Sequence, residues 1–363
     1  MTMASPSVLH IDTGTLLRGG QRQLLLLSEH LQRLGINQAI ASPKASELSR
    51  RTIHLPVTPV SPYSLLRIFR LGPLKEAVAA YGINIIHAHD SHAHTLGLRL
   101  KRACPGLKLV VTRRVAFLPS SPLSRRFKYR RAVDRYIAIS RAVAAVLTGA
   151  GVPGERISVI PSALDIDQIF RAEADPGFIA RMFPGCAKVI VSIGSLTPEK
   201  NMATAVRAYS LVVKRLPDVG MIVLGEGPQR GALEDVKLRL HLDNLVLAGH
   251  REPVAPILKA CDLFLLCSTS EGLNTSAIEA AACGLPLVVS NVGGLPEIAE
   301  EGYNGILCPP GRAERFAGAV VELLTDDARR REMSARGVKK AETFDIHAAA
   351  EKTLAVYNSL LAG

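Results

Sequence analysis

The 363-residue sequence lacks any apolar run that approaches the roughly 20 residues of a membrane-spanning helix. Residues 1–7 carry no basic charge, and the apolar run behind them covers only residues 8–11, so we expect no secretory signal peptide. The six cysteines form no paired motif, which favours buried, reduced thiols in a cytoplasmic protein. Aromatic residues make up only 4% of the chain and no nucleic-acid-binding module accompanies its charge, which argues against a nucleic-acid partner.

Positive charge is concentrated in the first half of the chain. The net charge is +12, but residues 1–170 contain 23 Lys and Arg against 9 Asp and Glu, whereas residues 171–363 contain 21 against 23. This asymmetry indicates an anionic partner for the first half alone. One basic cluster with interleaved aromatic residues fits either a solvated helix face or attraction to an anionic membrane surface: Arg125, Arg126, Lys128, Arg130 and Arg131.

Short apolar runs alternate with helical patterns in both halves of the chain. The expected strands of the first half are residues 8–12, 83–87, 108–112, 136–140 and 157–161, and those of the second half are 188–193, 221–224, 245–247, 263–266 and 287–290. Such alternation predicts parallel sheets with helices on both faces. We therefore expect an α/β protein with two doubly wound, Rossmann-like domains that face a cleft and bind ligands beyond the carboxyl ends of their strands.

Two glutamates eight residues apart, Glu271 and Glu279, lie between two of these apolar runs. The segment SEGLNTSAIEA predicts a loop followed by a helix, with one carboxylate in the loop and the other in the helix. The amides near Leu273, Asn274 and Thr275, at the start of that helix, form a ready anion site. Two acids beside a phosphate cradle suit a ligand with phosphates and hydroxyls, such as a nucleotide-sugar. The alternative is a surface loop with a solvated glutamate.

Two further loops in the second half also follow apolar runs. In GSLTPEKN, Gly194 and Ser195 follow one run, and Lys200 precedes a helix that we expect to begin near residue 201. A lysine there can neutralise charge that develops on a leaving phosphate. In LGEGP, Gly225 and Glu226 follow another run, and the glycine permits close approach of the backbone to a flat base. The alternatives are a solvated lysine and an ordinary turn.

Two segments of the first half are also candidates. The first loop ends in Arg18, Gly19, Gly20 and Gln21, which is no complete GxGxxG motif, so we predict no dinucleotide site, although its backbone can approach a phosphate or a sugar. The four histidines of HAHDSHAH span a strand end and a helix start, so they cannot all point one way, and we expect no metal site. A single histidine, His89, is the candidate to hydrogen-bond a sugar hydroxyl.

Taken together, these motifs resemble the family 4 glycosyltransferases, which have the GT-B fold. The spacing of Glu271 and Glu279 is similar to the E-x7-E motif of that family, and NVGGLPE at residues 291–297 is similar to its GG-x-P-E segment. The segments at Gly194–Lys200 and Gly225–Pro228 and the glycines after Arg18 fall in matching places and in the same order. The resemblance spans nearly the whole chain and is most specific in the second half.

The resemblance implies retaining transfer of a sugar from a nucleotide donor, with no cofactor or metal required. Carried over by position, Glu271 contacts the donor sugar, Lys200 the diphosphate and Glu279 the ribose, while His89 matches a histidine of the family's H-x-H segment. Glu271, Lys200 and His89 are thus the candidate catalytic residues. The candidate donor-binding residues are Gly19, Gly20, Gly194, Ser195, Gly225, Glu226, Leu273, Asn274, Thr275 and Glu279.

The resemblance also implies a domain plan and a substrate class. Residues 1–170 form the acceptor-binding domain, residues 171–340 the nucleotide-sugar-binding domain, and residues 341–363 a helix that packs back on the first domain. The expected donor is UDP- or GDP-linked, and the expected acceptor is a glycan or glycolipid in cell-envelope polysaccharide or lipopolysaccharide synthesis. We expect a cytoplasmic enzyme, peripheral on the inner face of the membrane if the basic cluster binds anionic lipid.

One residue departs from the family pattern. Ser195 stands where the family often has an arginine, so one cation for the diphosphate is missing from its usual place. Either Arg18, Arg113 or Arg114 substitutes for it, or the donor is held less tightly. Two other functions stay open: a nucleotide-sugar epimerase or hydrolase on the same scaffold, and a basic membrane or nucleic-acid adaptor.

Overall fold

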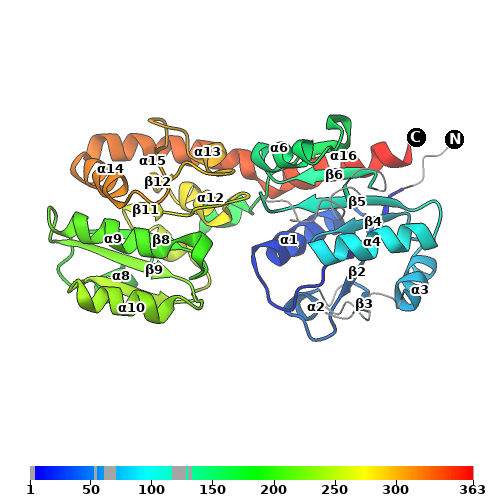
Figure 1. Cartoon of the computed structure of the whole chain (residues 1–363), viewed down its shortest axis with the longest axis horizontal. Coiled ribbons are helices and arrows are strands. Elements are labelled where there is room, and N and C mark those ends of the chain that lie inside the picture. Colours follow the sequence, from blue (N-terminus) through cyan, green and yellow to red (C-terminus); the bar gives the residue numbers. More distant parts are fainter. Residues whose placement is uncertain (1–4, 53–54, 61–70, 117–127, 130–132, 363) are drawn as a thin grey trace. The chain divides into compact units, whose positions relative to one another are not determined.

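The computed structural model describes residues 5–52, 55–60, 71–116, 128–129 and 133–362. The chain forms two compact units, one made of residues 1–164 and 346–363 and the other of residues 165–345 (Figure 1). Of the predicted basic cluster, Arg125, Arg126, Arg130 and Arg131 lie outside the described residues. No helix in the described ranges is long and apolar enough to cross a bilayer.

The first unit is built on a parallel sheet of seven strands, in the order β3-β2-β1-β4-β5-β6-β7. The strands of the described chain are β1 (Ser7–Ile11), β2 (Asn37–Ser42), β3 (Val57–Pro59), β4 (Ile85–Ala88), β5 (Lys108–Arg113), β6 (Arg135–Ala138) and β7 (Ile157–Val159). Strands β1 and β4 lie at the centre and are wholly buried, which explains their almost continuous apolar sequence.

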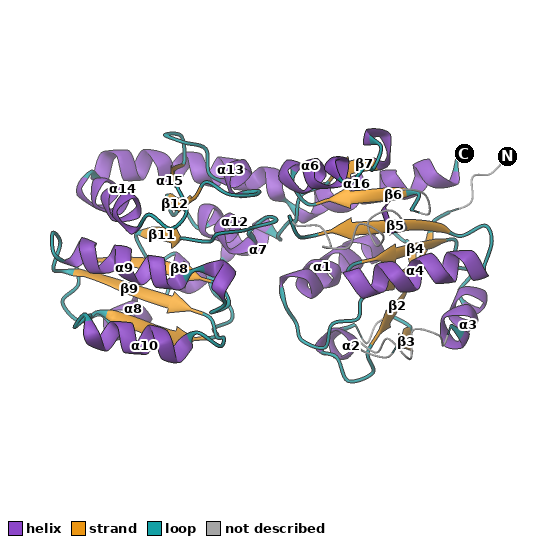
Figure 2. Cartoon of the chain, viewed as in Figure 1, coloured by secondary structure: helices purple, strands orange, loops and turns teal. Residues whose placement is uncertain are grey.

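Helices cover both faces of this sheet (Figure 2). They are α1 (Gly19–Arg33), α2 (Glu47–Arg51), α3 (Gly72–Ala80), α4 (Ser91–Ala103), α6 (Arg141–Gly149) and α16 (Ile346–Leu361), with a 3₁₀ turn η1 (Gly154–Arg156). The last helix of the chain, α16, packs against α1 in this unit, where Tyr357 is fully buried with Leu31 and Val8. The side chains of Asp90 and Ser140 cap the N-termini of α4 and α6.

The second unit contains a parallel sheet of six strands, in the order β10-β9-β8-β11-β12-β13. Its strands are β8 (Lys188–Ile193), β9 (Val219–Leu224), β10 (Leu245–Gly249), β11 (Leu263–Leu266), β12 (Leu287–Ser290) and β13 (Gly305–Cys308). The neighbouring strands β9, β8, β11 and β12 each end in a loop that carries one of the predicted motifs. Because parallel strands present their carboxyl ends at one edge, these loops are neighbours.

Helices again cover both faces of the second sheet. They are α7 (Ile166–Arg171), α8 (Pro176–Met182), α9 (Met202–Val213), α10 (Arg230–Arg239), α11 (Ala255–Leu258), α12 (Thr275–Ala282), α13 (Leu295–Ile298), α14 (Ala313–Thr325) and α15 (Asp327–Ala341), with 3₁₀ turns η2 (Pro198–Lys200) and η3 (Glu342–Phe344). The core between α9, α14 and the sheet contains large buried side chains such as Tyr209 and Phe316. The two Rossmann-like parallel sheets confirm the predicted fold class.

Candidate active site

Glu271 is the centre of the polar cluster at the carboxyl edge of the second sheet. Its Oε1 accepts hydrogen bonds from Lys200 Nζ at 2.6 Å, Ser268 Oγ at 2.8 Å and Asn274 Nδ2 at 3.0 Å. The residue is only 7% exposed, so this carboxylate is held by three donors in a largely water-free setting. No described donor reaches Oε2, which therefore remains free to accept a hydrogen bond from a ligand.

Lys200 is placed by the turn that follows β8. The 3₁₀ turn η2 ends at Lys200, and Asn201 then adopts a left-handed conformation with φ of 49° before α9 begins. A Cβ added to Gly194 would lie 3.5 Å from Lys200 Cδ, so the lysine stem runs directly over this glycine. The turn thus directs the ammonium group of Lys200 to Glu271. The resulting ion pair joins two residues that lie 71 positions apart in the sequence.

Asn274 links the carboxylate to the start of α12. Its Oδ1 accepts from the backbone N–H of Ala277 at 2.8 Å, which caps the helix, while its Nδ2 donates to Glu271. The eight-residue helix α12 thereby begins beside the Lys200–Glu271 pair. Leu273 and Asn274 are buried, whereas Thr275 and Glu279 are half-buried on this helix. Of the predicted residues, the structure brings Lys200, Glu271 and Asn274 into direct contact, and the roles of all of them toward a substrate stay predictions.

Glycines allow the loops of this edge to touch through their backbones. Gly293, from the GG-x-P-E-like segment, has φ of +54°, and an added Cβ would lie 1.8 Å from the carbonyl oxygen of Glu271. Gly225 has φ of +146°, and an added Cβ would lie 1.9 Å from the carbonyl oxygen of Gly194. The absence of a side chain at Gly225 therefore lets its backbone lie close to the neighbouring loop, which carries Gly194.

The remaining residues predicted at this edge lie nearer to solvent. Ser195 Oγ lies 3.3 Å from Thr197 Oγ1, and both are exposed enough to exchange this contact for water or a ligand. Glu226 is half-exposed and forms an ion pair with Arg230 at 2.8 Å. Arg230 also bonds Glu234, so Glu226 shares its cation with a second carboxylate. An exposed, shared ion pair of this kind is easily rearranged by a ligand.

At the carboxyl edge of the first sheet, Gly19 and Gly20 form the first turn of α1. An added Cβ on Gly20 would lie 3.4 Å from Cδ of Arg114, so the half-buried side chain of this arginine passes directly over the start of this helix. Asp12, at the end of β1, accepts from Gln21 Nε2 and from the N–H of Gly14, both at 2.9 Å. This loop is therefore fixed by its own polar residues.

His89 belongs to a group of three buried histidines. His10 Nδ1 lies 3.0 Å from His89 Nε2, and the ring of His87 lies 4.0 Å from that of His89 between centroids. His10 comes from β1 and lies opposite His87 in the register of β1 and β4. Sequence reasoning missed His10, because only strand pairing brings it to the HAHDSHAH segment. His94 packs elsewhere, against Tyr129 and Tyr136.

The histidine group also meets the geometric condition for a transition-metal site. One nitrogen of each of His10, His87 and His89 lies within 4.8 Å of the others. However, His87 bonds Tyr357 at 2.6 Å and Thr112 at 2.7 Å, which engages both of its ring nitrogens. His10 is likewise bonded at both nitrogens, to His89 and to Gln38. These nitrogens serve a hydrogen-bond network in this structure.

Burial keeps these histidines neutral. It lowers the pKa of His10 to about 4 and that of His94 to about 3, and it holds the pKa of His87 and His89 well below the usual value. The unfolded chain binds a proton at each of them below a pKa of about 6.5. The free energy of unfolding therefore decreases as the pH falls below that value, by on the order of 2 kcal/mol for each of His10 and His94 between pH 7 and pH 5.

Replacing His94 by phenylalanine tests this acid sensitivity. A flat aromatic ring is retained and one buried ionisable group is removed, so we expect His94→Phe to lose less stability than the wild type between pH 7 and pH 5. Urea unfolding at the two pH values measures the difference. The control is His250→Phe, because the side chain of His250 is 64% exposed. An identical pH dependence of His94→Phe and wild type would show that His94 is not buried as the neutral form.

Comparison with known proteins agrees with this arrangement. The family Glycosyltransferase Family 4 matches residues 17–168, and the family Glycosyl transferases group 1 matches residues 187–326. A D-inositol 3-phosphate glycosyltransferase from Segniliparus rotundus is 28% identical over 325 residues, which are 83% of this chain and 72% of that protein. The UDP-Gal:alpha-D-GlcNAc-diphosphoundecaprenol alpha-1,3-galactosyltransferase from Escherichia coli is 30% identical over 182 residues, 47% of this chain and 46% of that protein.

A solved structure shows the same fold. The crystal structure of Anabaena Alr3699/HepE in complex with UDP is similar with a TM-score of 0.85 at 21% identity, covering 97% of this chain and 100% of that one. Several curated relatives are matched over less than two thirds of their own length. With both family matches and the shared architecture, the chain belongs to the family 4 glycosyltransferases of the GT-B fold, which confirms the resemblance inferred from its motifs.

Proposed function

We propose that the protein is a retaining glycosyltransferase that moves a sugar from a UDP- or GDP-linked donor to a saccharide or lipid-linked acceptor. The observation that supports this most directly is the cluster of Glu271, Lys200 and Asn274 at the start of α12. It presents a cation, helix amides and a free carboxylate oxygen side by side. In a nucleotide-sugar the diphosphate is attached directly to the sugar that carries the hydroxyls, so groups of both kinds lie equally close together.

In this proposal each group of the second unit binds one part of the donor. Lys200 and the amides of Leu273, Asn274 and Thr275 hold the diphosphate, because a cation and a helix N-terminus both favour negative charge. Glu271 Oε2 accepts a hydrogen bond from a hydroxyl of the donor sugar, and Glu279 accepts from the ribose. The loops of Gly194–Ser195 and Gly225–Glu226 border the nucleotide.

The proposed reaction is a front-face displacement. The bond between the sugar C1 and the phosphate oxygen breaks, and the acceptor oxygen bonds C1 from the same face, so the configuration is retained. The departing phosphate accepts the proton of the acceptor hydroxyl. Lys200 stabilises the charge on the leaving group. Because Oε1 of Glu271 is already bonded to three donors, this carboxylate serves as a fixed acceptor for the substrate and need not transfer a proton.

The proposed acceptor is anionic or lipid-linked and belongs to cell-envelope glycan synthesis. Two observations support this proposal: the positive charge of residues 1–170, and the names of relatives that act on inositol 3-phosphate or on a diphosphoundecaprenol. Lys128 is the described member of the basic cluster, and its Nζ donates to the backbone of Ser91 at 2.6 Å. Attraction to an anionic membrane would then localise the enzyme at the cytoplasmic face.

Co-sedimentation with vesicles tests the membrane part of the proposal. We expect binding that rises with the fraction of anionic lipid and falls with salt, because the attraction is electrostatic. The test variant is Arg125→Gln/Arg126→Gln, which removes two positive charges of the cluster. The control is Arg102→Gln, which removes one exposed positive charge outside the cluster. Binding to neutral vesicles as strong as to anionic ones would contradict this part.

Replacing Glu279 tests the donor site. We expect Glu279→Ala to raise the KM for the donor by about 10- to 100-fold, the loss of a charged hydrogen bond to the ribose, with a smaller effect on the acceptor. The exposed Glu314 of α14 provides a matched control, and Glu314→Ala should behave as the wild type. Enzyme and nucleotide-sugar are also incubated without acceptor. Accumulation of an isomer or free sugar at the rate of transfer would favour an epimerase or hydrolase.

A further inference from the structure

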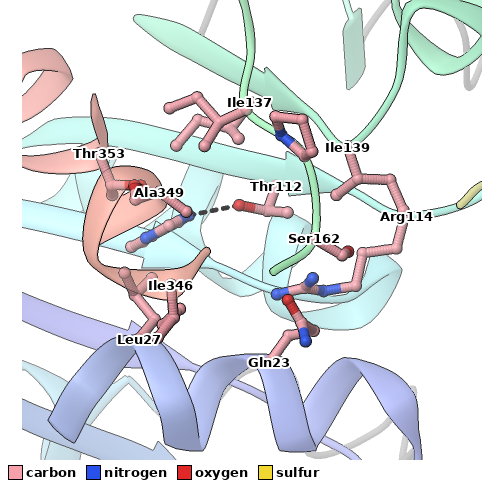
Figure 3. Close-up of a pocket in the computed structure, with 13 residues that line it drawn as sticks. Gln23, Leu27, Thr112, Arg114, Ile137, Ile139, Ser162, Ile346, Ala349 and Thr353 are labelled. Atoms are coloured by element: carbon pink, nitrogen blue, oxygen red, sulfur yellow. Dashed lines mark hydrogen bonds between the residues drawn. The ribbon is translucent and has the colours of Figure 1, made fainter. Parts of the chain in front are cut away.

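Arg114 lies just beyond the end of β5 and enters a small pocket of the first unit. The pocket has a volume of about 40 Å³, and its lining comes from α1, from the carboxyl ends of β4 to β7 and from α16. In Figure 3 the guanidinium of Arg114 lies between Gln23 and Ser162. The volume is enough for roughly two or three water-sized groups. It therefore suits a compact charged group rather than a ring.

The guanidinium has hydrogen-bonding capacity that its surroundings leave unused. Its Nε is buried and has no hydrogen-bond partner among the described residues. The amide of Gln23 exchanges two hydrogen bonds with Ala163, at 2.7 and 2.8 Å, and Thr112 is bonded to His87. Two neighbouring polar side chains, those of Gln23 and Thr112, are thus already paired with other residues. A buried N–H that lacks a partner costs free energy, which a bound acceptor would recover.

The positive charge of Arg114 also lacks a close counter-ion among the described residues. Burial lowers its pKa to about 10, so the side chain stays protonated at neutral pH, and Asp12 is the carboxylate that opposes this shift. No described carboxylate forms an ion pair with Arg114 within 4 Å, and Asp12 is bonded to Gln21 and Gly14. Arg114 is half-buried, and a charge that is partly withdrawn from water without a close counter-ion lowers stability.

The histidine network holds Arg114 in place. Gln38 Nε2 donates to the carbonyl of Ser28, so its Oε1 faces His10 and must accept from His10 Nε2. The Nδ1 of neutral His10 then accepts from His89 Nε2, which leaves His89 Nδ1 as the acceptor for Arg114 Nη2 at 3.4 Å. Each bond fixes the tautomer of the next ring, and the chain ends on the guanidinium.

We propose that Arg114 binds a phosphoryl group of a substrate, with His89 and His10 as the residues that position it. The inference rests on the proposed function, because it takes the phosphoryl group to be carried by the acceptor or by the donor diphosphate. The free Nε and a neighbouring N–H form the fork that binds two phosphate oxygens at once.

Titration with inorganic phosphate tests the site directly on the full-length protein. We expect phosphate to shift the ¹H–¹⁵N NMR signal of the Arg114 Nε–H group and to raise the melting temperature through mass action. In Arg114→Gln we expect the apparent Kd for phosphate to rise at least tenfold, and in Arg114→Lys less, since lysine keeps the charge but loses the fork. Arg102→Gln removes an exposed arginine of the same unit and should bind phosphate as the wild type does.

Two results would contradict the proposal. If phosphate stabilises Arg114→Gln and the wild type equally, or leaves the Nε signal in place, the proposal is wrong. Circular dichroism first establishes that each variant is folded, and Arg114→Lys supplies the test if Arg114→Gln is not. Loss of transfer in Lys200→Ala probes the donor site independently, so a failure of the phosphate site and a failure of the proposed function give different patterns.

A second arm identifies which substrate carries the phosphoryl group. If UDP and phosphate raise the melting temperature additively, phosphate and nucleotide occupy different places, and the acceptor is the source. If UDP abolishes the effect of phosphate and Arg114→Gln weakens UDP binding, the donor diphosphate is the source. An additive effect that persists in Arg114→Gln would again overturn the proposal.

The positioning role of His89 has its own test. His89→Asn keeps an oxygen near the place of Nδ1, so it retains an acceptor for Arg114, whereas His89→Leu removes it. We expect His89→Asn to bind phosphate within a fewfold of the wild type and His89→Leu to bind about tenfold more weakly. Equal phosphate binding by the two folded variants would show that the network only supports the fold.

Discussion

Lys200→Ala is expected to lower kcat for sugar transfer by about 10²- to 10³-fold, because the charge on the leaving phosphate loses its cation. The exposed Lys214 at the end of α9 gives a matched control, and Lys214→Ala should retain full activity. The measurement is steady-state transfer with saturating donor and acceptor. Near-normal turnover of Lys200→Ala would remove this lysine from the reaction.

The same substitution also affects stability, and the two effects must be separated. Lys200 neutralises a carboxylate that is only 7% exposed, so its loss leaves Glu271 buried with two neutral donors. Breaking a buried pair costs about 3–5 kcal/mol, although the partial exposure of Lys200 reduces this figure. The double variant Lys200→Met/Glu271→Gln removes both charges. We expect it to recover most of the lost stability and none of the activity.

Gly293→Ala is expected to abolish most of the activity by moving Glu271. The new methyl group would lie 1.8 Å from the carbonyl oxygen of Glu271, far inside van der Waals contact, so one of the two loops must shift. Because Lys200, Ser268 and Asn274 all bond the Glu271 side chain, that shift breaks the cluster. A displacement of about 1 Å in such a site can cost about a hundredfold in rate.

Gly302→Ala is the matched control for this prediction. Gly302 has a similar positive φ of +72°, but a Cβ added there meets no atom within 4 Å. Both variants carry the backbone strain of a left-handed alanine, about 1–2 kcal/mol, and only Gly293→Ala carries the collision. Melting temperature and transfer rate are measured for both. Equal losses in the two variants would mean that the contact with Glu271 is unimportant.

Much of the fold was predictable because parallel strands buried on both faces have a strong local signal. The expected strands at residues 188–193, 263–266 and 287–290 coincide with β8, β11 and β12. Strands β2, β3 and β13 were missed, since β2 begins with the polar Asn37 and Gln38 and the other two are only partly buried. Partly buried or partly polar strands are defined by their neighbours more than by their own sequence.

The candidate site was predictable to the level of its loops. Each motif follows an apolar run, and parallel topology brings the ends of such runs to one edge. The sequence did not reveal that Lys200 and Glu271 form an ion pair, or that Asn274 bonds Glu271 and caps α12 at once. Those contacts depend on the side-chain directions that η2 and the left-handed Asn201 impose.

The amino-acid sequence by itself determined the two-sheet α/β class, the glutamate pair, the lysine and the glycine positions of a family 4 glycosyltransferase. These are local patterns, set by the spacing of apolar residues and by the residue types that turns require, so they can be recognised without knowledge of distant contacts. Only the tertiary structure decided that His10 meets His89 and that Arg114 ends their network with an unpaired N–H. Residues 79 positions apart become neighbours because β1 and β4 pair side by side, and no local pattern encodes that register.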